Sequence, residues 1–454
     1  MKKVLFINPA VNKCGVPHTG LAMLGAVLKE QGHAVKIADY HFFSKTPKIE
    51  KILDDFRPDV VGISLFSCAV SVADKMITVI KGKNKNIPLL CGGPHTSSYY
   101  KELSTDSRFD YIIIGEAESI IVDLVEKATS NKLPQVIYAP LPDINKLPFP
   151  DYTSFYNHES IDLYPIITSR GCPFNCSFCS VRLSNSKNWR PRSLGNCIEE
   201  LKRIKSELIF VKSVMIWDDN FSLDIDRAKL FLQLWLKEKF QYKLSLANVR
   251  ADKIDKEFLS LLKRAGCEEV QFGVEHGNPE VFRHVEKGET LEDIRRAAKL
   301  VNQCGMKLGC SFIIGLPHDT LKRTLDSIKF AKELKPDHIH WNILVPYKGT
   351  RVYEYFKKNG QANNASIPFT IPQDGLSFEP NADTPYFTRE ERKKAYLMAL
   401  LLSKDDLLLQ DIRKTFYRAL EYNLIKEFLQ WLISAKIIKN LIWTARKRMS
   451  RYKR

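Results

Sequence analysis

The chain has 454 residues, 44% of them apolar, and a formal net charge of +17 at neutral pH. This length and apolar content predict two or three domains with buried cores. Ten cysteines without a secretory signal exclude a disulfide-stabilised scaffold, and no stretch reaches the ~18 uncharged apolar residues of a membrane-spanning helix. We therefore expect a cytoplasmic protein.

Residues 1–138 alternate short apolar runs with amphipathic stretches such as 21–31 and 71–81. Such alternation predicts an α/β domain with a doubly wound, Rossmann-like parallel sheet, whose ligands bind beyond the carboxyl ends of the strands. The expected strands are residues 3–8, 34–38, 60–64, 88–91 and 111–114.

Candidate binding residues follow four of these strands. They are Asn8; Ser64 and Leu65; Gly92, Gly93, Pro94 and His95; and Gly115 and Glu116. Glycine at a strand end lets the backbone approach a ligand closely. We expect these residues to form one binding edge.

Residues 139–160 are rich in proline and aspartate, which predicts a linker. Residues 161–355 then show six strand–helix units, which predicts an open partial (β/α)6 barrel with its chemistry at the carboxyl ends of the strands. The expected strands are 163–168, 208–217, 243–247, 269–274, 308–314 and 338–345, and the helices between them are 196–205, 227–237, 256–265, 291–304 and 321–334.

Three cysteines with the spacing C-x-x-x-C-x-x-C follow the first barrel strand, at Cys172, Cys176 and Cys179. A four-iron cluster takes one thiolate per iron, so three thiolates leave one iron open, much as a catalytic zinc site keeps an open position. The alternatives are a zinc site or three unrelated core thiols. Zinc motifs normally include a fourth Cys or His at matched spacing, and none lies close by.

Residues 356–454 predict a helical region that ends in a basic, amphipathic tail. The stretch 424–443 is amphipathic and aromatic, and residues 436–454 carry basic charges without an acid. Such a segment either lies on an anionic membrane surface or packs against the barrel. The first alternative predicts peripheral membrane contact and a lipid or other membrane-associated substrate.

The cysteine motif and its flanks resemble the radical SAM superfamily, in which the open iron chelates the methionine end of S-adenosylmethionine. The strand ends of residues 1–138 resemble the cobalamin-binding domain in front of many radical SAM barrels. This is the family of the anaerobic Mg-protoporphyrin monomethyl ester cyclase and of cobalamin-dependent methyltransferases. The resemblance covers residues 1 to about 350 and implies three cofactors, a [4Fe–4S] cluster, S-adenosylmethionine and cobalamin.

The resemblance also implies roles for barrel residues. Phe178 would pack on adenine, Asp218 or Asp219 would accept hydrogen bonds from the amino group of S-adenosylmethionine, Arg250 would pair with its carboxylate, Glu275 would bind the ribose, and Phe312, Ile314, Gly315 and Pro317 would lay backbone against adenine. Each has a plain structural alternative, namely core packing, a helix cap, a salt bridge or a turn. The sequence does not decide between the two aspartates.

One motif departs from the pattern of cobalamin domains. Those that bind cobalt through histidine carry D-x-H-x-x-G after the first strand, where this chain reads Asn8-Pro9-Ala10-Val11-Asn12-Lys13. The sequence Asp39-Tyr40-His41 follows the second strand and lacks the glycine, so we interpret it as coincidence. We expect the lower face of the cobalamin not to be held by histidine.

The implied reaction is reductive cleavage of S-adenosylmethionine at the cluster to a 5′-deoxyadenosyl radical, with methyl transfer from cobalamin to an unactivated carbon. Some relatives instead use the radical for cyclisation or ring contraction. The implied partners are a small-molecule or lipid substrate and an external electron donor of the flavodoxin or ferredoxin type. Nucleic acid is disfavoured as a partner.

Two other functions compete with this interpretation. A methylthiotransferase would use three further N-terminal cysteines for a second cluster, and Cys14, Cys68 and Cys91 are the candidates. Its positive charge would suit tRNA, but the helical C-terminal pattern does not match a small basic β-barrel after the core. A cobalamin sensor or carrier would not need an open iron.

Overall fold

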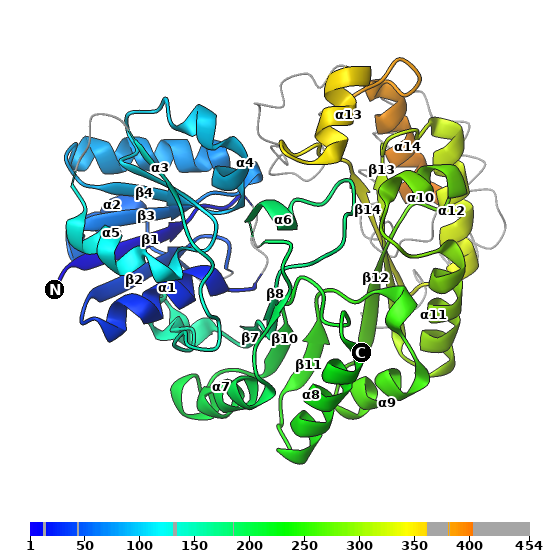
Figure 1. Ribbon diagram of the computed structural model, residues 1–454, viewed down its shortest axis with the longest axis horizontal. Helices are drawn as coiled ribbons and strands as arrows, with labels where there is room; N and C mark the ends of the chain where they lie inside the picture. Colours follow the sequence, from blue (N-terminus) through cyan, green and yellow to red (C-terminus); the bar gives the residue numbers. More distant parts are fainter. Residues whose placement is uncertain are drawn as a thin grey trace, which may run out of the picture.

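Figure 1 shows a computed structural model of the protein. It describes residues 1–11, 15–42, 45–129, 134–184, 186–360, 380 and 382–402. An N-terminal domain built on a sheet lies beside a curved set of strands with helices on its outer side.

The N-terminal sheet is parallel throughout, in the order β2-β1-β3-β4-β5-β6. The strand order reverses between β1 and β3, which makes their carboxyl ends the topological switch point, where such sheets bind ligands. Its strands are β1 (Lys3–Asn8), β2 (Ala34–Asp39), β3 (Val60–Ser64), β4 (Leu89–Gly92), β5 (Tyr111–Ile114) and β6 (Gln135–Tyr138).

Helices cover both faces of this sheet because its strands are apolar on both sides. Val4 and Phe6 of β1 belong to one buried cluster with residues of α1 (Thr19–Glu30) and α5 (Ile121–Lys127). The alternate residues, Leu5 and Ile7, belong to a second cluster. It includes residues of α2 (Ile49–Phe56) and α3 (Val70–Lys83), and α4 (Pro94–Leu103) packs against it.

The segment expected to be a linker is packed on the N-terminal domain. Asp151 N–H donates to the carbonyl of Ala22 at 3.0 Å, and Tyr156 N–H donates to that of Ile37 at 3.0 Å. Tyr152 is fully buried. Strand β6, just before this segment, was not predicted; its apolar run Val136–Tyr138 is short, and as an edge strand it leaves its side chains partly exposed.

The second part of the chain is an open six-stranded barrel in two halves. The parallel sheets β7-β10-β11 and β12-β13-β14 are joined by a bridge between Val249 and Phe272. The strands are β7 (Leu163–Ile166), β10 (Ser213–Ile216), β11 (Lys243–Leu246), β12 (Glu269–Glu275), β13 (Lys307–Ile314) and β14 (His338–Ile343). The helices are α7 (Leu194–Glu207), α8 (Ile225–Lys237), α9 (Lys256–Arg264), α10 (Pro279–Val285), α11 (Leu291–Gln303) and α12 (Leu321–Leu334).

Alternate residues of the barrel strands face opposite sides. Phe312 and Trp341 are buried and stack on each other, with ring centroids 4.5 Å apart. The intervening positions face the other side, where Gln271 Nε2 donates to Ser311 Oγ at 2.9 Å. The strands therefore bury one face against the helices and leave the other polar.

Two further helices, α13 (Arg351–Asn359) and α14 (Arg389–Leu402), follow the barrel. Arg392 of α14 is buried and donates from Nη1 to the carbonyl of Gly315 at 2.8 Å, which fixes α14 to the end of β13. With these helices the predicted fold class is confirmed. The predicted segments 424–443 and 436–454 lie outside the described residues.

In the part of the chain that the structure describes, every helix is too short or too polar to span a membrane.

Candidate active site

The three cysteines of the motif lie on one loop at the carboxyl end of the barrel strands. This cysteine loop, residues 171–180, runs from β8 (Ser169–Arg170) to the short helix α6 (Val181–Ser184). Gly171 enters it with a φ of 84°, and a Cβ there would lie 2.3 Å from the carbonyl oxygen of Asn188. Only glycine fits, because both the backbone and the available space exclude a side chain.

Neighbouring elements fix the cysteine loop from two sides. Ser177 N–H donates to the carbonyl of Val285, at the end of α10, at 2.8 Å. The carbonyl of Ser177 accepts from Val352 N–H, at the start of α13, at 3.0 Å. The positions of the cysteines are thus set by the barrel and not by the loop alone.

The donor set fits a four-iron cluster. Cys172, Cys176 and Cys179 are free and partly buried. Burial, and next to it the Cys179 thiol, raises the pKa of Cys176 to about 12. A thiolate there needs cationic partners, which the irons supply. Within the described ranges no three His, Cys, Asp or Glu side chains surround a single-ion position; a four-iron cluster instead binds each thiolate at a different iron.

The two aspartates after β10 have different partners. Asp218 is 1% exposed and accepts from the N–H and the hydroxyl of Thr168, both at 2.6 Å, and from the hydroxyl of Ser169 at 2.7 Å. Asp219 Oδ2 accepts from Gly171 N–H at 2.9 Å, which places its carboxylate at the cysteine loop. Asp218 therefore holds the end of β7, and Asp219 lies at the site.

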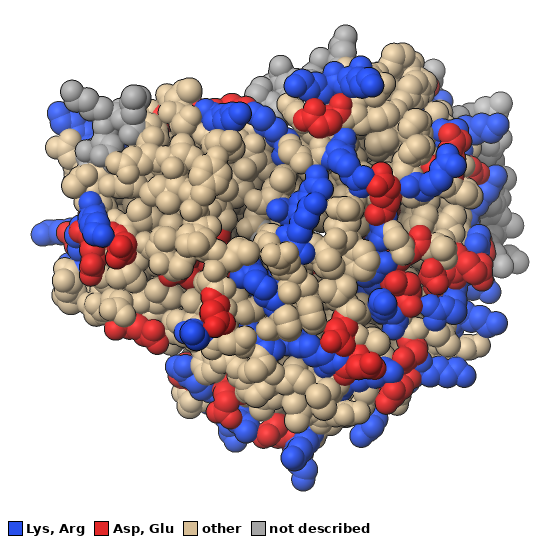
Figure 2. Space-filling model, viewed as in Figure 1, with Lys and Arg blue, Asp and Glu red and all other residues tan. Residues whose placement is uncertain are grey.

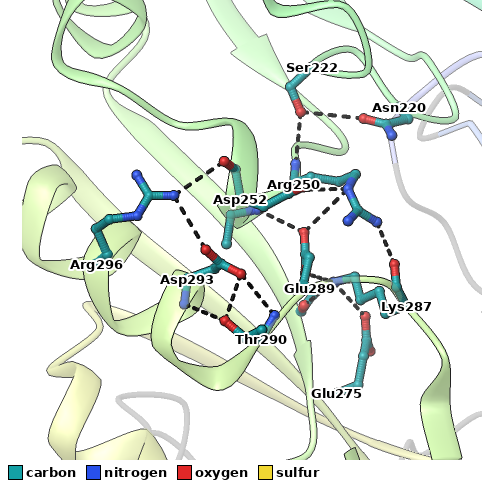
Figure 3. Close-up of polar contacts among 12 residues, drawn as sticks. Asn220, Ser222, Arg250, Asp252, Glu275, Lys287, Glu289, Thr290, Asp293 and Arg296 are labelled. Carbon is teal, nitrogen blue, oxygen red and sulfur yellow. Dashed lines mark hydrogen bonds and ion pairs between the residues drawn. The ribbon is translucent and has the colours of Figure 1, made fainter. Parts of the chain in front are cut away.

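Figure 3 shows a charged network that includes Glu275, Lys287 and Glu289. Lys287 Nζ lies 3.2 Å from Glu275 Oε1 and 3.1 Å from Glu289 Oε2, and it donates to the carbonyl of Gly273. Burial lowers the pKa of Lys287, but the two glutamates outweigh burial and raise it. The lysine is thus a cation at neutral pH, and its charge lowers the pKa of Cys176.

Glu275 ends β12 in an unusual backbone conformation. Its φ is 66°, and the β12–β13 register shifts between Gly273 and Glu275. A left-handed non-glycine residue at a strand end is sparsely populated and clusters at functional sites. The Glu275 charge raises the pKa of Cys176 and Cys179, so this carboxylate lies near the cysteine loop, where ribose binding was predicted.

One guanidinium nitrogen of Arg250 is buried without a hydrogen-bond partner. Its guanidinium lies 3.6 Å from the centroid of the Phe174 ring, Nη1 donates to the carbonyl of Lys287 at 2.7 Å, and Nε donates to Asp252 at 2.9 Å. Nη2 is buried without a hydrogen-bond partner. A buried guanidinium N–H of this kind fits an anionic ligand such as the methionine carboxylate.

Four residues predicted to contact adenine lie at and just after the end of β13. Phe312 and Ile314 bury their side chains toward the helices, and Pro317 is buried too. Gly315 N–H donates to Asp319 at 2.8 Å, and its carbonyl accepts from Arg392. The polar backbone groups of Gly315 are therefore engaged within the protein, and so are the carbonyls of Phe312 and Ile314, which accept from Asn342 Nδ2 and Leu344 N–H.

Phe178, between the last two cluster ligands and next to Cys179, packs against a small buried cluster. This cluster includes Val285 of α10 and Leu316 after β13. The structure thus gives Phe178 a packing role at the site.

At the switch point of the N-terminal sheet, hydrogen bonds fix the predicted binding edge. Asn8 Nδ2 donates to Asp39 Oδ1 at 2.8 Å, and His18 Nε2 lies 2.9 Å from Ser64 Oγ. The polar groups of Asn8 and Ser64 are therefore held at the carboxyl ends of β1 and β3.

In the segment after β4, the backbone of Gly93 lies very close to the backbone of Leu65. Gly93 has a φ of 98°, and a Cβ there would lie 2.9 Å from the backbone N and O of Leu65. Pro94 starts α4 directly after it, and Gly92 accepts from Leu65 N–H at 2.8 Å. His95 N–H donates to the carbonyl of Leu65 at 3.0 Å, so this edge is continuous from β3 to β4.

Glu116 lies between the domains. Gly115 leads to it with a φ of 91°. Glu116 Oε2 lies 2.6 Å from Arg170 Nη1, and Glu116 Oε1 pairs with Arg190 of β9 (Arg190–Pro191). Its carboxylate is thus engaged with the barrel, a role that the predicted contact with cobalamin did not include.

Sequence reasoning missed several residues of this site. Lys287 and Glu289 lie in a loop after α10 without a motif that marks them. Asn220 hydrogen-bonds Cys172 and follows the aspartate pair, and His18 caps α1. The only signal in the sequence was that these residues lie close to strand ends that carry candidate binding residues.

Comparisons with known proteins agree with this geometry. The model of the radical SAM superfamily matches residues 166–331, and that of the B12 binding domain matches residues 13–125. An uncharacterised methyltransferase of Pyrococcus horikoshii is 30% identical over 87% of this chain and 90% of its own length. A putative methylthiotransferase of Methanocaldococcus jannaschii is 28% identical over 73% of this chain and 76% of its own.

Among solved structures, the radical S-adenosylmethionine methyltransferase TsrM from Kitasatospora setae superimposes with a TM-score of 0.66 at 18% identity, over 86% of each chain. This likeness shows the same fold. The cofactors of the chain are a [4Fe–4S] cluster, S-adenosylmethionine and cobalamin. With its two domain types in this order, and a relative at 30% identity over nearly its whole length, the chain belongs to the radical SAM enzymes that carry an N-terminal cobalamin-binding domain.

Proposed function

We propose that this protein is a cobalamin-dependent radical SAM methyltransferase that methylates an unactivated carbon of a small-molecule or lipid substrate. The ion pair of Glu116 and Arg170 carries the proposal, because it joins the carboxyl edge of the cobalamin-binding sheet to the start of the cysteine loop. When bound, the cluster and S-adenosylmethionine supply a 5′-deoxyadenosyl radical and cobalamin supplies the methyl group.

Residues of the cysteine loop and of the barrel strand ends would hold the first two cofactors. Cys172, Cys176 and Cys179 bind the cluster. Asp219 accepts hydrogen bonds from the amino group of S-adenosylmethionine, and Arg250 pairs with its carboxylate through Nη2.

Three groups complete this site. Glu275, fixed by Lys287, takes the ribose hydroxyls. The backbone of Phe312–Ile314 and the ring of Phe178 lie against the adenine. These groups orient the sulfonium and keep water away from the reacting atoms.

The switch point of the N-terminal sheet would hold cobalamin. The backbone of Gly92 and Gly93, with the neighbouring Ser64, Leu65 and His95, bounds the space for the corrin. Glu116 fixes this edge against the barrel and would thereby hold a bound cobalamin next to the barrel.

A methylthiotransferase is the second candidate, because one relative carries that name. Its second cluster would need Cys91, which is fully buried, lies 3.0 Å from Thr96 Oγ1, and has its pKa raised to about 12 by burial. Cys14 lies outside the described residues. The burial of Cys91 favours methyl transfer.

Anaerobic reconstitution tests the proposal. We expect one four-iron cluster and one corrinoid per chain, and 5′-deoxyadenosine from S-adenosylmethionine and dithionite. The variant with Cys172, Cys176 and Cys179 all changed to Ala is the negative control. Two clusters without cobalt would instead support the methylthiotransferase, and absence of 5′-deoxyadenosine would refute radical chemistry.

The cellular setting is a separate part of the proposal. We place the enzyme in the cytoplasm, with an external one-electron donor, and propose that residues 424–454 bind a membrane that holds a lipid substrate. Flotation with liposomes of anionic lipid tests this: the full chain should float and a chain lacking 424–454 should not. Equal flotation of both would refute it.

A further inference from the structure

The cysteine loop reaches the molecular surface. Pro173 and Asn175, which lie between the first two cluster ligands, are exposed, whereas Gly171 and Ser177 are buried. An electron that enters from outside can therefore reach the cluster ligands through this exposed part of the loop.

The segments that contact the loop are strongly basic. Residues 181–191 lie against Gly171, 279–288 contact Ser177, and 346–360 contact Ser177 and Asn175. Together these segments carry nine bases and three acids, the bases being Arg182, Lys187, Arg190, Arg283, Lys287, Lys348, Arg351, Lys357 and Lys358 and the acids Glu280, Glu286 and Glu354.

Some of these basic side chains lie on the outside of the molecule, whereas Lys287 is largely buried beside Glu275 and Glu289. Figure 2 shows Lys and Arg gathered over α6 and α13. Lys187, Lys357 and Lys358 are exposed and form no ion pair with the residues that the structure describes.

We propose that this basic rim, defined by Lys187, Lys357 and Lys358 on two segments that contact the cysteine loop, docks an acidic one-electron carrier protein. An uncompensated patch of one sign steers a partner of the opposite sign and raises its rate of association. One electron leaves the carrier, which is oxidised, and enters the cluster held by the three cysteines, which is reduced. No proton or group is transferred.

This inference rests on the proposed function, since a carrier is needed only if the cluster is reduced during turnover. It goes further by naming where the carrier binds and which charges recognise it. Comparing flavodoxin with dithionite as the reductant separates the docking of a carrier from the proposed radical chemistry. Dithionite is a small molecule and does not need the rim.

The test compares two triple variants with the wild type, each reconstituted with its cluster. One changes the rim (Lys187→Glu, Lys357→Glu and Lys358→Glu). The control changes three exposed lysines without ion pairs within the described residues, on α2, on α3 and just after α3 (Lys51→Glu, Lys75→Glu and Lys85→Glu). Iron content and melting temperature should match in all three proteins.

The readouts are formation of 5′-deoxyadenosine with reduced flavodoxin or with dithionite, and the affinity for flavodoxin at low and high salt. We expect the rim variant to lose at least about tenfold in the flavodoxin-supported rate and in affinity at low salt. Its dithionite-supported rate should equal that of the wild type, and the control variant should behave as the wild type throughout.

Equal flavodoxin affinity for the rim variant and the wild type would overturn the proposal, as would an equal loss in both variants or with both reductants. If the wild type yields no 5′-deoxyadenosine even with dithionite, the proposed function fails. The affinities measured on the same proteins still decide whether the rim binds the carrier.

Discussion

Glu116 and Arg170 form a buried ion pair between the two domains, with 2.6 Å between Oε2 and Nη1. Each residue is 8% exposed. Arg170 also lies 2.8 Å from Glu118, and it is two residues before the first cluster ligand. The pair therefore couples the end of the cobalamin-binding sheet directly to the cysteine loop.

Replacing Glu116 with Gln should weaken this coupling. The change leaves Arg190 and part of Arg170 without a carboxylate, which costs about 3 kcal/mol for a buried pair. We expect a lower melting temperature and less bound corrinoid per chain, with normal iron content. The exposed Glu126, whose nearest ion-pair contact is His33 at 3.8 Å, gives a matched control as Glu126→Gln. Equal behaviour of both variants would contradict the coupling.

Asp218 and Asp219 should respond differently to the same change. Asp218→Asn puts an amide opposite donors from Thr168 and Ser169, and should reduce the free energy of unfolding by about 2–3 kcal/mol. Asp219→Asn should keep the fold and lower the affinity for S-adenosylmethionine roughly tenfold, the effect of about 1.4 kcal/mol. Calorimetric titration of the reconstituted proteins and thermal melts distinguish the two. The reverse pattern would show that Asp218 faces the cofactor.

Arg250→Lys keeps the positive charge but removes the planar fork. It loses the free Nη2 and the stacking on Phe174, so the affinity for S-adenosylmethionine should fall about tenfold while the iron content stays normal. Arg203→Lys on α7 is the control, because that exposed guanidinium pairs with Glu207 of the same helix. Unchanged affinity in Arg250→Lys would remove Arg250 from the site.

His95 should make the N-terminal domain sensitive to acid. Burial lowers the pKa of His95 from its ordinary 6.5 to about 4. Between these values the unfolded chain binds a proton that the folded chain does not, so the stabilisation is complete above pH 6.5 and is lost as the pH falls toward 4.

The size of the His95 effect is up to roughly 3 kcal/mol, at 1.36 kcal/mol per pKa unit. Urea unfolding of the wild type and of His95→Gln at several pH values measures it. The stability difference between the two proteins should narrow as the pH falls from 6.5 to 4. A constant difference would show that His95 titrates normally in the folded protein.

The sequence alone determined those features that depend on short-range pattern. The C-x-x-x-C-x-x-C spacing lies within one loop. Apolar runs predicted most strands of both domains, and the structure has strands at these positions. These signals are local, so they can be recognised without knowing what packs against what. Strand β6 was missed although Val136–Tyr138 are apolar, because so short a run does not distinguish an edge strand from a loop.

Only the tertiary structure decided the role of each candidate site residue. Asp218 and Asp219 are neighbours in sequence, yet contacts with residues about fifty positions away separate them into a strand anchor and a site residue. Lys287 and Glu116 acquire their roles through partners on other strands and in the other domain. The free energy of a buried charge depends on the groups packed around it, and those groups are brought together only by the complete fold.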